Sequence, residues 1–321
     1  MKKFVFLAAL MFSTFIPSVS WGQQYPTKPI KIVVGFVAGG APDIIARIIG
    51  KKLSDSVGQP VVIENKAGAS GNIAAQSVVA SEPDGYTLLM ATVSVAISPS
   101  YQPNLAFSPA RDFTPVGMVA SVPLILIAKP ELGVNNLQEL IALAKAKPGQ
   151  LNYASVGPGS PQHLSGELFQ YLGSVKMAHI PYKGGGPATQ SVLAGETDLF
   201  FAGMPPAMPF VRSGKVKALA VTSAKRSSAA PEVPTVQQAG MQGFEADNWH
   251  ALYAARGTPT PIVDKLNLEL QRILSAPDVK EQLLNQGAEA WLSTPLETRN
   301  YLVAEIDKWS KVVKAAGLKA E

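Results

Sequence analysis

Residues 31–43 read KIVVGFVAGGAPD, and they decide how the chain folds. The first seven residues form a short apolar, β-branched run typical of a buried strand, and Gly39 and Gly40 follow it as a turn. Beyond the turn, apolar residues recur at helical spacing, at Ile44, Ile45, Ile48, Ile49 and Leu53. This part of the chain is therefore predicted to run strand, glycine turn, helix.

The same unit recurs along the chain. Strands are also predicted at residues 60–64, 87–93, 151–156, 179–182, 199–201 and 217–222. Glycine turns at residues 68–72, 157–160 and 183–186 open further helices, two of them at residues 161–173 and 187–195. Strands that alternate with helices need crossover connections and form parallel sheets. With a length of 321 residues, the pattern predicts two α/β lobes of similar construction.

The last third of the chain has a different pattern. Residues 224–240 contain Pro231 and Pro234 and are predicted to be an irregular linker. Apolar residues at helical spacing then predict helices at residues 262–274, 279–284 and 296–316, with Trp309 on the apolar side of the last one.

Composition excludes several classes of protein. The chain has no cysteine, which rules out disulfides, thiolate metal sites, cysteine nucleophiles and a lipoprotein anchor. The histidines at 163, 179 and 250 lack the spacing of a helix-borne zinc site. Lysine and arginine number 28 against 23 acidic residues, a net charge of +5, but charged residues make up only 16%. Because the basic clusters are short, no nucleic-acid partner is expected.

The first 22 residues read as a secretory signal peptide. Two lysines follow Met1, residues 4–16 are almost entirely apolar, and Ser20 and Gly22 occupy the two small positions if cleavage precedes Gln23. The apolar run is shorter than the roughly 20 residues that span a bilayer. A secreted, soluble mature chain without a lipid anchor is therefore expected.

The glycine turns are candidate anion sites. Each lies where a strand feeds the N-terminus of a helix, and unpaired backbone N–H groups and the helix dipole favour anions there. A single such turn more often only reverses the chain. Four of them in two lobes, at the carboxyl ends of strands, favour ligand binding.

Enzyme motifs are mostly absent. No P-loop or G-x-S-x-G motif occurs, and residues 157–162 begin like a dinucleotide fingerprint but end in Gln162. Ser160 and His163 lie about one helical turn apart. They are expected to be a helix cap and a first-turn residue. The alternative is the Ser–His pair of a secreted α/β hydrolase or transferase.

The ordered motifs resemble a known family. They are YPTKPI at residues 25–30, GGAPD at 39–43, NKAGASGN at 65–72, PDGYTL at 83–88, GPGS at 157–160 and PYKG at 181–184. This order is similar to that of the tripartite tricarboxylate transporter receptors (TctC type), the Bug family of periplasmic solute-binding proteins. The resemblance covers essentially the whole mature chain.

The resemblance implies a type II periplasmic binding protein fold, with two doubly wound α/β lobes joined by two crossover strands. Residues 1–22 would be the signal peptide, residues 23–119 with 247–321 the first lobe, residues 120–222 the second lobe and residues 223–246 the return linker. A ligand would lie in the cleft between the lobes, and hinge closure would bury it.

The resemblance also implies a set of ligand-binding residues around that cleft. In the family, backbone N–H groups of the first glycine turn and of its partner in the second lobe hold a ligand carboxylate. The residues so implied here are Ala38, Gly39, Gly40, Ala41, Ser70, Thr92, Ser94, Ser155, Gly159, Ser160, His163, Tyr182, Gly184 and Ala202.

Two departures from the family pattern bear on the ligand. The first turn of the family often reads Gly-Gly-Pro-Thr-Asp, whereas Ala41, Pro42 and Asp43 here lack the hydroxyl, so one ligand hydrogen bond would be lost or supplied by water. Ala202 stands where the family often has an aspartate after Phe201. Without that aspartate an amino acid is a less favoured ligand. We therefore expect a carboxylate with an apolar far end, aromatic acids included.

The resulting expectation is a monomeric, non-catalytic periplasmic receptor without cofactor or metal. It would capture a small organic acid and deliver it to a membrane transporter or to a sensor kinase.

Overall fold

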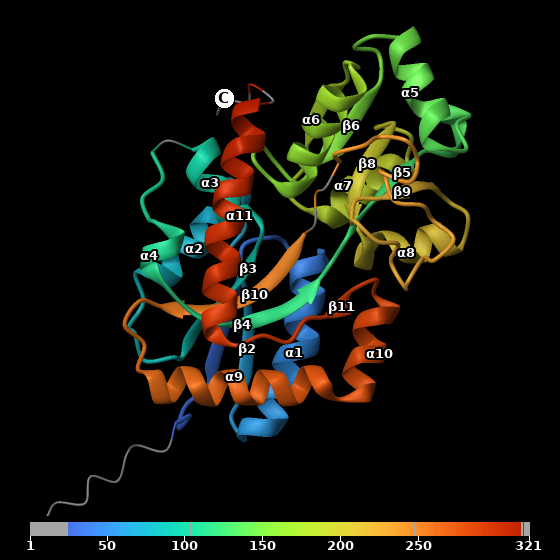
Figure 1. Ribbon diagram of the computed structural model, residues 1–321. Helices are drawn as coiled ribbons and strands as arrows, with labels where there is room; N and C mark the ends of the chain where they lie inside the picture. The colour runs from blue at the N-terminus through green and yellow to red at the C-terminus, as the bar shows by residue number, and fades with distance from the viewer. Residues whose placement is uncertain (1–24, 103, 245, 247, 316, 318–321) are drawn as a thin grey trace, which may run out of the picture.

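A computed structural model describes residues 25–102, 104–244, 246, 248–315 and 317; the predicted signal peptide lies outside these residues. The chain forms two α/β lobes (Figure 1), each built on one sheet. In the first lobe the strand order is β11 (Glu289–Ala290), β4 (Phe113–Ser121), β10 (Trp249–Ala255), β3 (Thr87–Thr92), β1 (Ile30–Val34), β2 (Val61–Asn65). In the second it is β7 (Ala178–Pro181), β6 (Asn152–Ser155), β8 (Leu199–Gly203), β5 (Leu124–Ala128), β9 (Lys217–Val221).

Helices cover both sheets (Figure 1). Those of the first lobe are α1 (Ala41–Val57), the short η1 (Ala69–Gly71), α2 (Asn72–Val79), α3 (Ser94–Tyr101), α4 (Pro109–Asp112), α9 (Thr260–Ser275), α10 (Pro277–Asn285) and α11 (Pro295–Ala315). Those of the second are η2 (Pro130–Leu132), α5 (Leu137–Ala146), α6 (Pro161–Gly173), α7 (Gly185–Leu193) and α8 (Met204–Arg212). The helix predicted at 161–173 is confirmed at both ends.

The sheets are mixed, which corrects the prediction of parallel sheets. The strands that the strand–turn–helix pattern identified do pair in parallel: β1 with β2 and β3, and β6 with β7 and β8. By contrast, β10 is antiparallel to β3 and β4, and β5 is antiparallel to β8 and β9. Strand β11 is likewise antiparallel to β4, and β5 follows β4 directly, without a crossover helix that would make it parallel to a neighbour.

Two adjacent connections join the lobes. The chain leaves the first sheet after β4 and enters the second at β5 (Figure 1), and it returns between β9 and β10. The backbone N–H of Val122 donates to Asn248 O at 2.7 Å, and Thr222 N–H donates to Leu124 O at 2.9 Å. The crossing segments are therefore hydrogen-bonded to each other. Between β9 and β10, residues 223–244 form no helix or longer strand, yet Val233 and Phe244 are buried.

Helix α1, which begins at the end of the stretch 31–43, has the apolar spacing that the sequence predicts for a helix and a glycine at its end. Its core face comprises Ile45, Ile49 and Leu53, spaced one turn apart and fully or almost fully buried. At its C-terminus Gly58 adopts a left-handed conformation, with φ of 70°, and its N–H donates to Ser54 O at 3.1 Å. A glycine adopts this conformation without the steric cost that a Cβ would add.

The long helix α11 is anchored by a buried carboxylate. Trp309 is 1% exposed, as its predicted place on the apolar side requires. Its Nε1–H and that of Trp249 both donate to Glu305, at 3.1 and 2.9 Å. The Nζ of Lys308 lies 2.5 Å from the other Glu305 oxygen. The carboxylate thereby ties α11 to the crossing strand β10.

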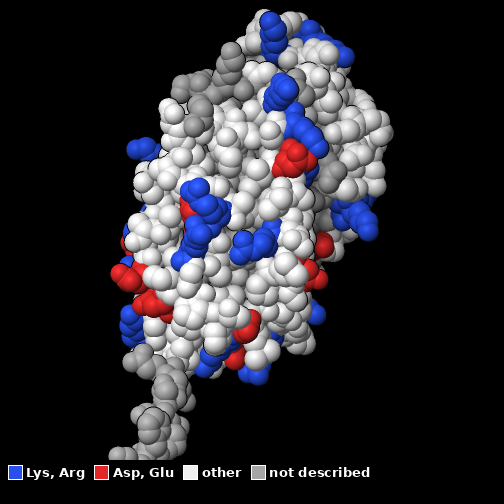
Figure 2. All heavy atoms as spheres, turned by 60° about the vertical axis from the view of Figure 1, so that its left-hand side comes forward, with Lys and Arg blue, Asp and Glu red and all other residues white. Residues whose placement is uncertain are grey.

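The surface carries dispersed charge. On the face shown in Figure 2, basic side chains are scattered among large uncharged areas, and several adjoin acidic ones. Within the described part of the chain, no helix combines the length and the apolar character that a bilayer crossing requires.

His250 lies in β10, in the core behind the join between the lobes. Its side chain is fully buried, and neither ring nitrogen has a hydrogen-bond partner among the described residues. Burial lowers the pKa of His250 to about 3, because the charged imidazolium would lose its hydration without gaining a partner.

This burial predicts a pH dependence of stability. Below about pH 6.5, His250 becomes protonated in the unfolded chain but stays neutral in the folded chain. The unfolded state therefore binds more protons, and the free energy of unfolding falls as pH falls. Replacing His250 by leucine should reduce that slope by up to about 1.4 kcal/mol per pH unit. Urea unfolding at pH 7, 6 and 5 measures the free energy of unfolding and so gives this slope. Equal slopes for the wild-type and His250→Leu proteins would show that His250 is protonated as easily in the folded chain as in the unfolded chain.

Candidate functional site

A narrow cavity of about 20 Å³ lies where the two lobes meet. We call it the inner cavity. Strand ends and helix starts from both lobes line it, together with one residue of the returning connection. The lining residues are Phe36, Gly40, Ala41, Pro42, Thr92, Val156, Pro161, Gln162, Gly185, Gly203, Pro206 and Asn248. None of them is charged.

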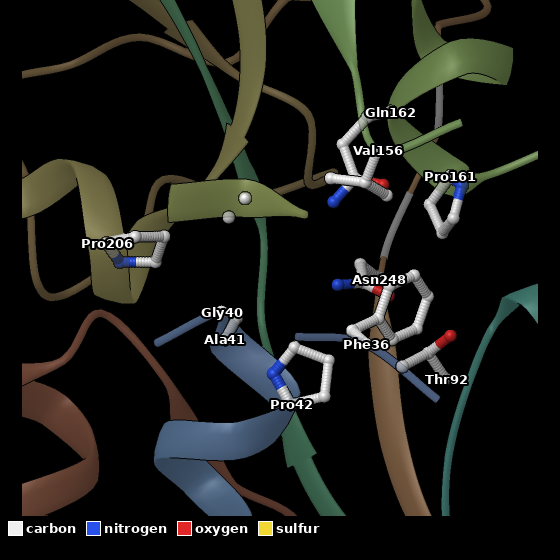
Figure 3. Close-up of a pocket in the computed structure, with 12 residues that line it drawn as sticks. Phe36, Gly40, Ala41, Pro42, Thr92, Val156, Pro161, Gln162, Pro206 and Asn248 are labelled. Carbon is white, nitrogen blue, oxygen red and sulfur yellow. The ribbon is translucent and has the colours of Figure 1, made fainter. Parts of the chain in front are cut away.

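Four of the described helices begin beside the inner cavity: α1, α6, α7 and α8 (Figure 3). Three of them, α1, α7 and α8, have a glycine at the N-cap position, so no side chain caps their first turn. Prolines in their first turns remove some N–H donors, but those of Ala41, Gly185 and Met204 remain. Helix starts present unpaired N–H groups and the positive ends of helix dipoles, so their convergence is an arrangement that favours an anion without any basic side chain.

Two carboxamides add donors to the same space. In Figure 3 the side-chain nitrogens of Gln162 and Asn248 point toward the space between Phe36 and Pro206. Their oxygens, Oε1 and Oδ1, are buried and have no hydrogen-bond partner among the described residues. The walls between these groups are apolar, formed by Phe36, Val156 and prolines. The arrangement suits a carboxylate attached to an apolar body.

A buried aspartate holds the first glycine turn in place. Asp43 is 2% exposed and accepts hydrogen bonds from Gly39 N–H, Arg47 Nε and Asn65 Nδ2, each at 3.0 Å. Asn65 Nδ2 also donates to Phe36 O at 2.9 Å. Burial alone would raise the pKa of Asp43, but the hydrogen bonds from Arg47, Gly39 and Asn65 outweigh it and hold the pKa below its usual value.

A second, wider cavity of about 570 Å³ adjoins the first and shares Phe36 and Val156 with it. We call it the outer cavity. Its other lining residues are Gly35, Ala67, Gly68, Ala69, Ser70, Gln102, Gly157, Pro158, Pro181, Tyr182 and Lys183. A small void of about 10 Å³ next to it is lined in part by Ser70, Thr92 and Ser94. The hydroxyl of Ser94 is buried there without a partner among the described residues.

Some of the implied ligand residues line these cavities. Gly40, Ala41 and Thr92 line the inner cavity, Ser70 and Tyr182 line the outer one, and Ser94 lines the small void. Ser70 also connects the lobes, because its hydroxyl donates to the backbone oxygen of Pro158.

Other implied residues line none of the three spaces. They are Ala38, Gly39, Ser155, Gly159, Ser160, His163, Gly184 and Ala202. Several have polar groups that serve the loop itself: Gly39 N–H donates to Asp43, and Ser155 Oγ accepts from Gly157 N–H at 2.9 Å. Gly159 packs instead against Tyr101 of the other lobe, where a Cβ would come within 2.6 Å of the ring.

Ser160 and His163 do not form a nucleophile–base pair. The Ser160 hydroxyl caps α6, accepting the backbone N–H of His163 at 3.3 Å. The His163 ring turns away, with Nδ1 accepting from Gly159 N–H at 3.1 Å and the ring 4.3 Å from that of His179. Burial, with His179 nearby, lowers the pKa of His163 to about 3. The hydrolase or transferase alternative therefore has no support in this geometry.

Gln162 and Asn248 are the functional candidates that sequence reasoning missed. Gln162 had a usable signal, because it is the second residue of a helix that follows a glycine turn. Asn248 had none, since it precedes a strand that the strand–turn–helix pattern does not reveal. Phe36 was assigned to a strand, but it follows β1 and lines both cavities.

Comparison with known proteins identifies the family of the chain. The model of the tripartite tricarboxylate transporter family receptor matches residues 45–318. BugT of Bordetella pertussis is 39% identical over 299 residues, 92% of each chain.

Two solved structures share the fold over nearly the whole chain. R. palustris Rpa4515 with adipate has a TM-score of 0.89 at 36% identity, covering 92% of this chain and 99% of that one. MatC (Rpa3494) from Rhodopseudomonas palustris with bound malate has a TM-score of 0.85 at 35% identity, covering 90% and 100%. The predicted two-lobed periplasmic binding fold is confirmed. The chain belongs to the receptor family of the tripartite tricarboxylate transporters, the periplasmic Bug-type solute-binding proteins.

Proposed function

We propose that this protein captures a small organic acid in the inner cavity and delivers it to the membrane subunits of a tripartite transporter or to a sensor kinase. The observation that carries the proposal is the convergence of four helix starts and two carboxamide nitrogens on one uncharged, partly apolar cavity. Such a site offers a carboxylate fixed hydrogen-bond donors. The adipate and malate held by two relatives are acids of the same class.

The lining also favours some carboxylates over others. Among the described lining residues of both cavities there is no aspartate or glutamate, so the ammonium group of an amino acid would find no counter-charge. Phe36 and Val156 instead offer apolar contact. These features support an acid with an apolar far end, aromatic acids included, over an amino acid.

The role is that of a receptor that releases its ligand unchanged. Ser160 and His163 serve the start of α6, and the hydroxyl of Ser70 in the outer cavity donates to the backbone oxygen of Pro158. Capture would close the lobes, residues 23–119 with 247–321 against residues 120–222, with residues 223–246 as the return connection. The protein would act as a monomer, because one chain supplies both walls of the cavity.

The receptor would reach the periplasm through its signal peptide. Expression of the full chain in a Gram-negative host should place the protein in the osmotic-shock fraction, with an N-terminus at or near Gln23 and no lipid attached. Mass spectrometry of the purified protein measures this, with a chain lacking residues 2–22 as the cytoplasmic control. Retention of Met1 in the shock fraction or in the membrane would contradict the proposed processing.

The inner cavity is tested by near-isosteric replacement of its two donors. In Gln162→Met and Asn248→Leu one N–H donor is lost while the volume is nearly kept, so affinity for a bound carboxylate should fall about 10-fold or more in each. Titration calorimetry with adipate and malate, on protein refolded to remove carried-over ligand, measures the change.

Gln190→Met serves as the matched control, because Gln190 is an exposed glutamine on α7 of the same lobe. Its affinity should equal that of the wild-type protein. Unchanged affinity in both cavity variants, with intact circular dichroism spectra, would place the carboxylate elsewhere.

A further inference from the structure

Two histidines support the turn of the second lobe that touches the first lobe. We call residues 157–160 the contact turn. His163 Nδ1 accepts the N–H of Gly159 at 3.1 Å, and His179 Nε2 lies 2.6 Å from the hydroxyl oxygen of Ser155. That oxygen also accepts a backbone N–H of the contact turn at 2.9 Å. Each histidine therefore helps to fix the contact turn.

The contact turn and His163 meet the first lobe together. The Ser70 hydroxyl donates to the backbone oxygen of Pro158. A Cβ at Gly159 would come within 2.6 Å of the Tyr101 ring. The rings of Tyr101 and His163 also meet edge to face, with their centroids 5.9 Å apart. His163 is only 7% exposed, and part of its cover is this tyrosine of α3. Separation of the lobes would therefore expose the imidazole to water.

The titratable groups around His163 come from both lobes. Besides Tyr101, the His179 ring of β7 lies 4.3 Å away, and Glu167 Oε1 on α6 lies 3.8 Å from His163 Nε2. Glu167 would favour a charged ring, but its Oε1 already accepts the hydroxyl of Tyr153 on β6 and a side-chain amide. Burial, with His179 nearby, dominates and lowers the pKa of His163 to about 3. The ring is therefore neutral while the lobes are in contact.

A second proton on the His163 ring conflicts with the observed hydrogen bond. Because Nδ1 accepts the N–H of Gly159, the neutral ring carries its proton on Nε2. In the charged ring both nitrogens are donors, so Nδ1–H would face the N–H of Gly159 and could not accept it. In an open cleft the ring can turn toward water, and its pKa then returns toward the ordinary value of about 6.5.

We propose that protonation of His163 favours the open form of the receptor, so that capture of the ligand releases a proton and weakens in mild acid. The closed form accommodates only the neutral ring, whereas the open form accommodates both charge states. A ligand held between the lobes therefore competes with the proton. This inference rests on the proposed function and adds control by pH to it.

Calorimetry measures the released proton directly. Adipate, malate and benzoate are titrated into the refolded mature chain at pH 6.5, in two buffers of different ionisation enthalpy. Since an exposed histidine is half protonated at this pH, binding to the wild-type protein should release about half a proton. Between pH 8 and pH 5.5 the affinity should fall about 10-fold beyond the change that ionisation of the acid itself causes.

Two histidine variants assign the proton to its residue. His163→Asn keeps an acceptor close to the place of Nδ1 but does not titrate. It should bind at pH 8 within about threefold of the wild-type protein, release almost no proton and show only the pH dependence of the acid. His250→Leu removes a buried histidine in the core of the first lobe and should keep the wild-type proton release. Thermal melting at pH 8 confirms that both variants are folded.

The outcomes separate this inference from the proposed function. Binding without proton release in the wild-type protein, or with equal release in His163→Asn, would overturn the inference and leave the carboxylate site intact. If none of the acids binds at pH 8, the proposed function fails for them, and small-angle X-ray scattering of the ligand-free protein decides the inference. The radius of gyration should be larger at pH 5.5 than at pH 8 in the wild-type protein only. Equal wild-type radii would overturn the inference.

Discussion

The structure depends on backbone N–H groups that helix formation leaves unpaired. The first turn of every α-helix presents such donors, and a buried donor without an acceptor is costly. Here four helices start beside one cavity, and three of them have no side chain that caps the first turn. The lobes thus meet around a space toward which several helix starts present N–H donors, and the proposed carboxylate would supply acceptors for them.

Using backbone donors has consequences for specificity and for motion. The donors are fixed by the helices, so binding does not have to order long basic side chains. These donors come from both lobes, however, so they surround one cavity only when the two lobes are close together. The contacts of Gly159 with Tyr101 and of Ser70 with Pro158 lie on this join. Near this join the crossing segments are hydrogen-bonded to each other, at Val122 and Thr222.

Sequence patterns identified the parts of the fold that repeat a local signal. The turns at residues 39–43, 157–160 and 183–186 precede helices as predicted, because glycine after an apolar run marks the change from strand to helix. Strands β4, β5 and β10 were not predicted. Their antiparallel pairing depends on how the lobes are joined, which is a long-range property.

The site was only partly predictable for a related reason. A turn sequence shows that donors exist but does not show which of them the loop uses itself. Asp43 takes the N–H of Gly39, and His163 takes that of Gly159, so these implied ligand donors serve the loops. Asn248 lines the cavity because the connection that returns from the second lobe passes beside it, which no local sequence pattern indicates. Motif order identified the family, whereas the donors that face the ligand required the three-dimensional arrangement.

The most direct test of the account is a crystal structure of the mature protein with a tightly bound carboxylate. We expect one carboxylate group in the inner cavity, within hydrogen-bond distance of Gln162 Nε2, Asn248 Nδ2 and backbone N–H groups at the starts of α1 and α7. An inner cavity without the carboxylate, with the acid held elsewhere by arginine or lysine side chains, would contradict the account.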